Sequence, residues 1–277
     1  MNLIEKEKKL RNYIKNLESC LVALSGGVDS SYLTLIAHQE LKDKMLAITA
    51  DSPSLPGEMK KIVQKFIKKF KIPHIFIKTE EIKDPIYYKN DGLRCYACKR
   101  QLFKKMKEIA KKGGFKVIID GTQGSDLTDE RPGRKAAEEL KVLSPLILFD
   151  FKKEEIRKRA KELGIEQWDL PESACLSSRI IQGEKITVEK LKMVEKGEEF
   201  LKKMGFKKLR VRHHNLLARI EVEKGEIERF FDMKLREKVL KFFKKNGFQF
   251  VTIDMEGYKR GGGNLRKIIK NNERSGV

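Results

Sequence analysis

Hydrophobic and polar positions follow two different rhythms along this chain, and the change falls near residue 180. Before the change, short continuous apolar runs are separated by segments that have the period of an amphipathic helix. The apolar runs predict buried strands at residues 20–24, 44–50, 73–77 and 116–120. Residues 144–149 are either a further strand or a buried connection.

The segments between these strands predict helices near residues 30–43, 98–112, 131–140 and 152–163, and a helix with Pro56 in its first turn. Continuous apolar strands that alternate with helices indicate a parallel sheet covered on both faces. We therefore expect an α/β fold with a doubly wound parallel sheet. Right-handed crossovers in such a fold place ligands at the carboxyl ends of the strands.

After the change of rhythm, the pattern predicts a small α+β domain. Its elements are a helix, two strands, a helix and a final strand, at residues 188–204, 207–214, 216–223, 224–246 and 248–253. We expect one domain over residues 1–180, which would bind the nucleotide and carry the functional cysteines. A basic domain over residues 181–277 would serve the substrate and oligomer contacts.

Charge and composition narrow the class of protein. The chain has 61 Lys and Arg against 40 Asp and Glu, a net charge of +21, and the segment 181–277 alone carries +11 (25 against 14). Such a field attracts anions, but most of the lysines alternate with glutamates along helices, which is typical of a solvated surface. The sequence has no apolar run long enough to span a membrane, and its N-terminus is too charged for a signal peptide. Its four cysteines are too few for a secreted disulfide scaffold. We therefore expect a reduced cytoplasmic protein.

A glycine-containing loop between the first strand and its helix is the strongest motif. The candidate nucleotide-binding residues there are Ser25, Gly26, Gly27, Asp29, Ser30 and Ser31. The glycines allow a tight turn, and backbone N–H groups at a helix N-terminus bind anions. The alternative is that the loop binds no nucleotide and is a turn whose side chains only cap the helix. Two further strand ends supply possible nucleotide contacts, or ordinary turns, at Ala50, Asp51, Gly121 and Thr122.

The motif SGGVDS at residues 25–30 resembles the signature of the PP-loop ATP pyrophosphatases, whose fold is similar to that of adenine-nucleotide hydrolases. These enzymes bind the pyrophosphate end of ATP, adenylylate a substrate and release pyrophosphate. The resemblance implies that Asp29 lies near Mg²⁺ and the phosphates.

Cysteines form a second candidate site. Cys95 and Cys98 make a CxxC motif, and Cys175 stands beside serines and Arg179. A redox dithiol would leave Cys175 unexplained, and the motif is not expected to open a helix after the first strand-helix-strand unit. A zinc site needs a fourth ligand, which no histidine supplies at a suitable spacing. A [4Fe–4S] cluster held by the three cysteines fits better, while Cys20 in the first strand is expected to pack in the core.

The whole set of motifs resembles the LarE family of ATP-dependent sulfur transferases of nickel-pincer nucleotide synthesis. They lie at residues 24–31, 129–137, 173–180, 209–213, 218–222 and 257–264. The resemblance implies that MgATP adenylylates the carboxylates of pyridinium-3,5-biscarboxylic acid mononucleotide. A sulfur nucleophile, from sulfide or another donor, then displaces AMP. The resemblance also implies a homo-oligomer.

The LarE family contains two types of enzyme. One consumes the sulfur of its own cysteine, at the position that matches Cys175, and the other resembles cluster-bearing enzymes and has two more cysteines. Because Cys95 and Cys98 are present, the resemblance favours the [4Fe–4S] type, in which Cys175 is a cluster ligand. Sacrificial donation from Cys175 is the alternative.

Arginines are the candidate ligands for the phosphate or carboxylates of the substrate. Arg210 and Arg212 alternate along a predicted strand and so share one face of it. They would act with Arg179 and Arg219, and Glu221 would pair with one of them. Arg131 and Arg134 also resemble a loop of the family near the active crevice. The alternatives are solvent-facing charges in the strands and helix capping before Pro132.

Three other functions compete with this interpretation. A tRNA thiolase shares the PP-loop and the three cysteines and would suit the net charge, but no RNA-binding addition is evident. A nucleotide-binding redox regulator would have no turnover. An amidating synthase would share the loop but would not require the cysteines. The residues therefore favour a small nucleotide substrate over nucleic acid.

Overall fold

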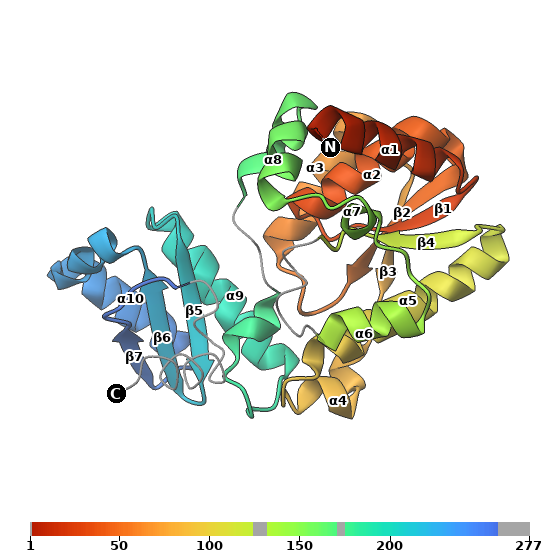
Figure 1. The fold of residues 1–277 in the computed structure, drawn as a ribbon. Coiled ribbons are helices and arrows are strands. Elements are labelled where there is room, and N and C mark those ends of the chain that lie inside the picture. Colours follow the sequence, from red (N-terminus) through yellow and green to blue (C-terminus); the bar gives the residue numbers. More distant parts are fainter. Residues whose placement is uncertain (1, 124–131, 171–174, 260–277) are drawn as a thin grey trace, which may run out of the picture. The chain divides into compact units, whose positions relative to one another are not determined.

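The computed structural model describes residues 2–123, 132–170 and 175–259, and the chain forms two compact units. Unit 1 consists of residues 1–87 and 93–173, and unit 2 of residues 88–92 and 174–277 (Figure 1). Cys95 and Cys98 therefore belong to unit 1 and Cys175 to unit 2. The predicted boundary after residue 180 falls within unit 2.

A four-stranded parallel sheet forms the centre of unit 1, which confirms the predicted fold class. Its strands are β1 (Cys20–Ala23), β2 (Met45–Asp51), β3 (His74–Lys78) and β4 (Val117–Asp120), in the order β3-β2-β1-β4. All three pairings are parallel, and Val22 lies opposite both Ala47 and Ile119. The four apolar runs thus form strands within one residue of their predicted positions.

Helices cover both faces of this sheet (Figure 1). Cys20 and Val22 face a core that includes side chains of α1 (Leu3–Lys15), α2 (Val28–Leu41), α3 (Gly57–Phe70) and α8 (Lys153–Glu162). Leu21 points to the opposite face and packs with side chains of α5 (Arg94–Gly113) and α6 (Pro132–Glu139). The alternation of neighbouring strand residues between the two cores explains why both faces of β1 are apolar.

The strand order creates a switch point at β1. The chain runs from β1 outward to β2 and β3, and then returns to the other side of β1 as β4. The helices of the two halves consequently lie on opposite faces of the sheet. In open α/β sheets a crevice forms at this position, outside the carboxyl ends of the strands.

Some local elements differ from the sequence predictions. Residues 144–149 are not a strand but contain the short helix α7 (Pro145–Leu148), because Pro145 lacks an N–H and suits the first turn of a helix. Only Leu143, just before it, makes an isolated bridge with Ile119 of β4. The helix α1 had no predicted counterpart, although Asn2 and Glu5 form a capping box at its start.

Four short elements connect the longer ones, and Trp168 of the last of them packs against the core shared with α1, α2, α3 and α8. They are η1 (Lys42–Lys44), η2 (Glu81–Lys83), α4 (Pro85–Tyr88) and η4 (Glu166–Asp169). No helix in the described ranges has the length and apolar character needed to cross a membrane.

Unit 2 is the small α+β unit that the sequence predicts. Its sheet has the order β5-β6-β7, with β5 (Leu209–His214) antiparallel to β6 (Leu217–Val222) and β7 (Phe250–Ile253) parallel to β6. Side chains of α9 (Val188–Lys203) and α10 (Met233–Lys245) share its core. The helix predicted over 224–246 is divided in two. Its first part forms the 3₁₀ helix η6 (Lys224–Phe231), and the Asp232 side chain then caps α10 by accepting from the N–H of Leu235 (2.7 Å).

Residues 88–92 join unit 2 through hydrogen bonds. The Asn90 side chain donates to the carbonyl of Ile181 (2.9 Å), and the Asn90 carbonyl accepts from the N–H of Gly183 (3.0 Å). The N–H of Ile186 donates to the carbonyl of Tyr88 (2.9 Å). This short segment therefore belongs to the hydrogen-bonded structure around residues 180–186.

Gly121, directly after β4, allows the closest backbone approach at the switch point. A Cβ atom at this position would lie 2.7 Å from Ser30 Cα and 2.8 Å from Ser30 N, in the first turn of α2. Backbone atoms cannot move aside as a flexible side chain can. The glycine therefore fixes how near the β4 loop comes to the loop after β1.

We predict that Gly121→Ala destabilises the protein by about 1–3 kcal/mol, because the added methyl group forces the β4 loop away from α2. Urea unfolding should measure this loss. Gly225→Ala is the matched control, since a Cβ there meets nothing within 4 Å. Equal stabilities of the two variants would contradict the steric explanation.

Candidate functional site

The loop between β1 and α2 is held in shape by its own serines. Ser30 Oγ accepts from the N–H of Ser25 (3.2 Å), donates to the carbonyl of Gly27 (3.0 Å) and lies 3.0 Å from Ser25 Oγ. Gly27 is the N-cap of α2, and Gly26 has a φ of 85°, in the left-handed region that favours glycine. The loop therefore presents the N-terminus of α2, whose first N–H groups have no partners within the helix.

Ser31, also predicted to contact the nucleotide, is fully buried in α2. Its hydroxyl has no hydrogen-bond partner in the described part of the chain. The structure thus separates the two adjacent serines, because Ser30 braces the loop and Ser31 points into the protein interior.

Asp29 makes an ion pair that the sequence did not indicate. Its Oδ2 lies 2.5 Å from Nζ of Lys153, the first residue of α8. Both side chains are largely buried, and 124 positions separate them in the sequence. The pair brings a positive charge to the first turn of α2, where the helix N-terminus already favours anions.

Two other predicted nucleotide contacts lie at the ends of β2 and β4. Asp51 ends β2 after Ala50 and pairs with Lys60 of α3 at 2.8 Å. Thr122 follows Gly121 and donates its hydroxyl to Asp120 Oδ2 (2.7 Å). Both positions therefore lie at the carboxyl edge of the sheet, as the sequence predicted from the strand ends.

Asp120 is the buried acid of this edge. Lys99 of α5 lies 3.1 Å from its Oδ2, and Ser144 donates to its Oδ1 (2.7 Å). Burial by itself would raise the pKa of Asp120, but the Lys99 charge and the hydrogen bonds from Thr122 and Ser144 hold that pKa below its usual value. Asp120 is therefore an anion that fixes Lys99 and Thr122 next to the switch point.

Cys95 and Cys98 are the second and fifth residues of α5, which begins four residues before the predicted helix. The CxxC motif thus lies at the start of a helix, but this helix follows β3 and α4 and not the first strand-helix-strand unit, in agreement with the sequence interpretation. Residues three apart on a helix lie on the same face, so the two thiols are neighbours. Cys95 is exposed and Cys98 partly buried.

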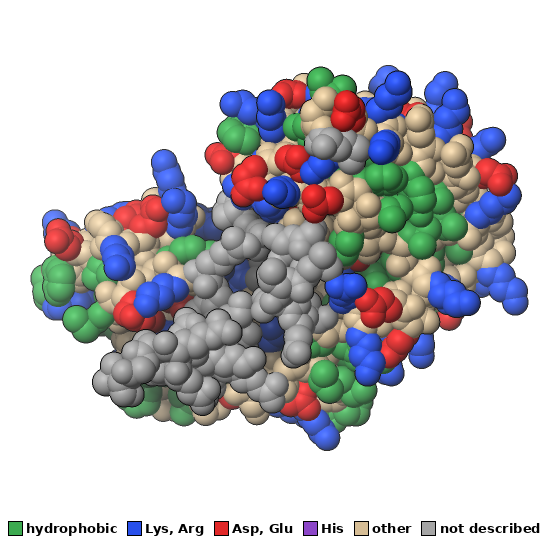
Figure 2. Space-filling view, viewed as in Figure 1, with side chains coloured by type: hydrophobic (Ala, Val, Ile, Leu, Met, Phe, Trp, Pro, Cys, Tyr) green, Lys and Arg blue, Asp and Glu red, His purple; other side chains and the backbone are tan. Residues whose placement is uncertain are grey.

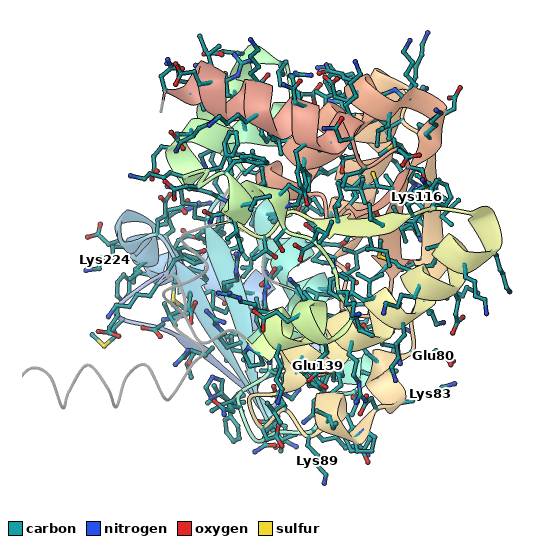
Figure 3. The ribbon with its side chains drawn as sticks, turned by 45° about the vertical axis from the view of Figure 1, so that its right-hand side comes forward. Glu80, Lys83, Lys89, Lys116, Glu139 and Lys224 are labelled. Carbon is teal, nitrogen blue, oxygen red and sulfur yellow. The ribbon has the colours of Figure 1, made fainter. Side chains whose placement is uncertain are left out.

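Helix α6 braces the turn that carries these two cysteines. Tyr96, between them, donates its hydroxyl to Glu139 Oε2 (2.7 Å), the last residue of α6, which Figure 3 labels. A Cβ on Gly133 of α6 would lie 3.0 Å from Lys99 Cδ and 3.5 Å from the carbonyl oxygen of Cys95. The close packing of α6 holds the CxxC turn in a fixed place on unit 1.

The other two cysteines differ from this pair. Cys20 is fully buried in β1, and burial raises its pKa to about 12, which leaves it a core thiol. Cys175 is partly buried at the start of η5 (Leu176–Arg179) in unit 2. None of the four cysteines forms a disulfide. Within residues 2–123, 132–170 and 175–259, no three His, Cys, Asp or Glu side chains gather in a group suited to a metal ion.

Two of the predicted substrate arginines are buried and form bidentate ion pairs with glutamates. Arg179 donates to both carboxylate oxygens of Glu198 in α9 (2.9 and 3.3 Å). Arg212 of β5 donates to both oxygens of Glu221 in β6 (2.9 and 2.9 Å), so the predicted pairing of Glu221 with an arginine is present. All four residues are less than a tenth exposed.

The remaining arginines are more accessible. Arg219 lies 3.0 Å from Glu221 and 3.5 Å from Asp254, and the Arg210 guanidinium lies 5.1 Å from the centre of the Tyr258 ring. Burial and the nearby Arg179 lower the pKa of Arg210. Since Arg210 and Arg212 occupy alternate positions of β5, they share a face as predicted. Their contact with a substrate stays a prediction.

The last two predicted arginines lie around α6. Arg134 is exposed and pairs with Glu138 at 2.7 Å, one helical turn away. Arg131 lies outside the described residues. Figure 2 shows Lys and Arg side chains dispersed among Asp and Glu over the visible face, in agreement with a solvated charged surface.

Comparison with known proteins identifies the family. Residues 16–202 match the family model described as Thiamine biosynthesis protein (ThiI). A protein of Lactiplantibacillus plantarum named pyridinium-3,5-bisthiocarboxylic acid mononucleotide synthase is 30% identical over 94% of each chain. An uncharacterised protein of Synechocystis is 40% identical over 94% of this chain and 97% of its own.

More distant similarity reaches a second group of enzymes. One of the subunits of the glutamine-hydrolysing GMP synthase of Pyrococcus furiosus is 27% identical over 73% of this chain and 70% of its own. The match with the sulfur-carrying nucleotide synthase is longer and has the higher identity, and the ThiI model covers residues 16–202. Taken with the SGGVDS loop between β1 and α2, they show that the chain belongs to the PP-loop family of ATP-dependent sulfurtransferases.

Proposed function

We propose that the chain converts the carboxylates of pyridinium-3,5-biscarboxylic acid mononucleotide into thiocarboxylates in nickel-pincer nucleotide synthesis. The observation that carries this proposal is the end-to-end similarity to the L. plantarum synthase, which includes both units. The braced loop at the switch point of the sheet supports it, because the reaction needs a site for the triphosphate of ATP.

The first step activates the carboxylate. A substrate carboxylate oxygen attacks the α-phosphorus of ATP, an acyl adenylate forms, and pyrophosphate leaves. The N-terminus of α2 and the nearby ammonium group of Lys153 supply positive charge where the departing pyrophosphate carries negative charge. Asp29 would act as the carboxylate ligand for Mg²⁺, in exchange for its contact with Lys153.

The second step introduces sulfur. A sulfide nucleophile attacks the acyl carbon, the bond to the phosphate oxygen breaks, and AMP leaves. Repetition at the second carboxylate gives the bisthiocarboxylate, with one ATP and one sulfide used for each carboxylate. We further propose that the active protein is a homo-oligomer.

The cysteines suit an iron–sulfur cluster in their chemistry. Thiolates are the ligands such clusters use, and Cys95 and Cys98 lie on one face of a helical turn and are not sealed in the core. Together with Cys175 they would hold three irons of a [4Fe–4S] cluster. Bound in this way, the cluster would supply a sulfide at its remaining iron.

We predict that Cys175→Ala abolishes thiocarboxylate formation but retains ATP-dependent adenylylation, because the thiol acts only in the sulfur step. Product analysis and ATP–pyrophosphate exchange separate the two steps. Cys20→Ala, a change in the core of β1, should retain both. Formation of ADP and phosphate in place of AMP and pyrophosphate would overturn the proposed reaction.

The cluster is tested by metal analysis. Protein purified without oxygen should contain about four iron atoms per chain and absorb visible light. Cys95→Ala and Cys98→Ala should lose this iron, whereas Cys20→Ala should keep it. Colourless protein with one zinc per chain would exclude the cluster and leave sacrificial donation from Cys175 as the sulfur source.

Lys153 gives a test of the nucleotide site. We predict that Lys153→Met weakens MgATP binding about tenfold or more, since it removes the ammonium group that would make a charge-assisted contact with the phosphates. Titration calorimetry with a non-hydrolysable ATP analogue measures the change. The neighbouring exposed Lys152 provides the control variant Lys152→Met, which should bind normally. Identical affinities of the two variants would place Lys153 outside the site.

The competing tRNA thiolase has its own signature. Binding of tRNA that weakens steeply with salt, together with a thiolated nucleoside as the product, would favour that function over ours. A protein that binds ATP without forming either product would instead be a regulator.

A further inference from the structure

The backbone just after Cys175 is held by an unusual concentration of hydrogen bonds. The carbonyl oxygen of Cys175 accepts from the N–H of Ser178 (3.0 Å), the hydroxyl of Ser178 (2.8 Å) and Nη1 of Arg179 (2.9 Å). A carbonyl oxygen has two lone pairs, so three donors saturate it. The peptide that follows the cysteine is therefore fixed in one orientation.

A second arginine holds the other end of the same turn. Nη1 of Arg212, in β5, donates to the carbonyl of Ser178 (3.0 Å). The next residues join β5 directly, since the N–H of Ile181 donates to the carbonyl of His213 (3.2 Å). The turn 175–179 is thus attached to β5 by both side-chain and backbone contacts.

Both guanidinium groups are neutralised on their remaining edges. Glu198 holds Arg179 and Glu221 holds Arg212 through both carboxylate oxygens. Glu198 Oε1 also accepts from the N–H of Val211 (3.3 Å), and Glu221 Oε1 also accepts from Arg219 (3.0 Å). A buried arginine needs such a partner, and its planar fork then holds two groups in a rigid relation. Arg179 thus connects Glu198 to the carbonyl of Cys175, and Arg212 connects Glu221 to the carbonyl of Ser178.

This arrangement differs from a substrate clamp. Arg179 directs Nε and Nη2 to Glu198, and Nη1 to the Cys175 carbonyl and the Ser178 hydroxyl (3.1 Å). Its side chain is only 2% exposed, so it has little surface to offer a mononucleotide. Arg212 is similarly buried and similarly occupied.

We propose that Arg179 and Arg212 are positioning residues that fix the turn 175–179 and thereby set the orientation and accessibility of the Cys175 thiol. The role of that thiol in sulfur transfer rests on the proposed function, whereas the fixation of the turn does not. In this proposal the two arginines act on the substrate only through Cys175.

The test is the alkylation rate of Cys175 in the full chain, treated with chelator and reductant and studied without ATP or substrate. Iodoacetamide labelling followed by peptide mass spectrometry gives the rates of Cys95, Cys98 and Cys175 in the same sample. The lysine in Arg179→Lys or Arg212→Lys cannot reproduce the bidentate contact of the guanidinium group with its glutamate. Each should raise the Cys175 rate about fivefold, the ratio that corresponds to one lost hydrogen bond. The rates of Cys95 and Cys98 should not change.

Arg229→Lys is the matched control within unit 2. Arg229 pairs with Glu226 at 2.8 Å and donates to the carbonyl of Met204 (2.7 Å), which is the same kind of contact away from the cysteine turn. This variant should leave the Cys175 rate unchanged. If the lysine variants fail to fold, Ser178→Ala removes one donor to the Cys175 carbonyl without a change of charge, and it should raise the rate in the same direction.

Unchanged Cys175 rates in Arg179→Lys and Arg212→Lys, with a raised KM for the mononucleotide, would overturn this inference and restore the arginines as substrate ligands. Since labelling requires no turnover, a failure of the proposed function would leave the labelling result intact. A wild-type rate in a variant that has lost thiolation would contradict the positioning role alone.

Discussion

The close approach of two backbones at Gly121 is the constraint on which the nucleotide site depends. The loop after β4 passes so near the first turn of α2 that no Cβ atom fits between them. Because β1 and β4 are neighbours at the switch point, this contact also determines where Thr122, Asp120 and Lys99 lie relative to the glycine loop. The positive and negative groups of that edge are therefore arranged by steric contact before any ligand is bound.

The sequence predicted the architecture well because strand burial is a local property. Both faces of β1 are covered, so its residues are continuously apolar, and the same applies to the runs that became β2 and β4. Elements whose type or starting point depends on a single residue were less predictable. Pro145 converted an apolar run into the short α7, and the cap at Asp232 divided a predicted helix in two.

The candidate site was predictable only in part, for a different reason. The glycine loop is contiguous in sequence, so its residues could be assigned together. Lys153 could not be found in this way, since its contact with Asp29 joins positions 124 apart and no motif marks the lysine. The strand period placed Arg210 and Arg212 on one face, but it could not reveal that Glu198, from a preceding helix, and Glu221 neutralise the buried arginines.

The short segment 88–92 limits how the chain can be divided into independent parts. Because it supplies Tyr88 and Asn90 to the hydrogen-bonded structure of unit 2, the polypeptide crosses between the units three times. A fragment that begins at residue 174 would lack residues 88–92, which belong to unit 2. A single cut in the chain therefore cannot release unit 2 with all of its residues.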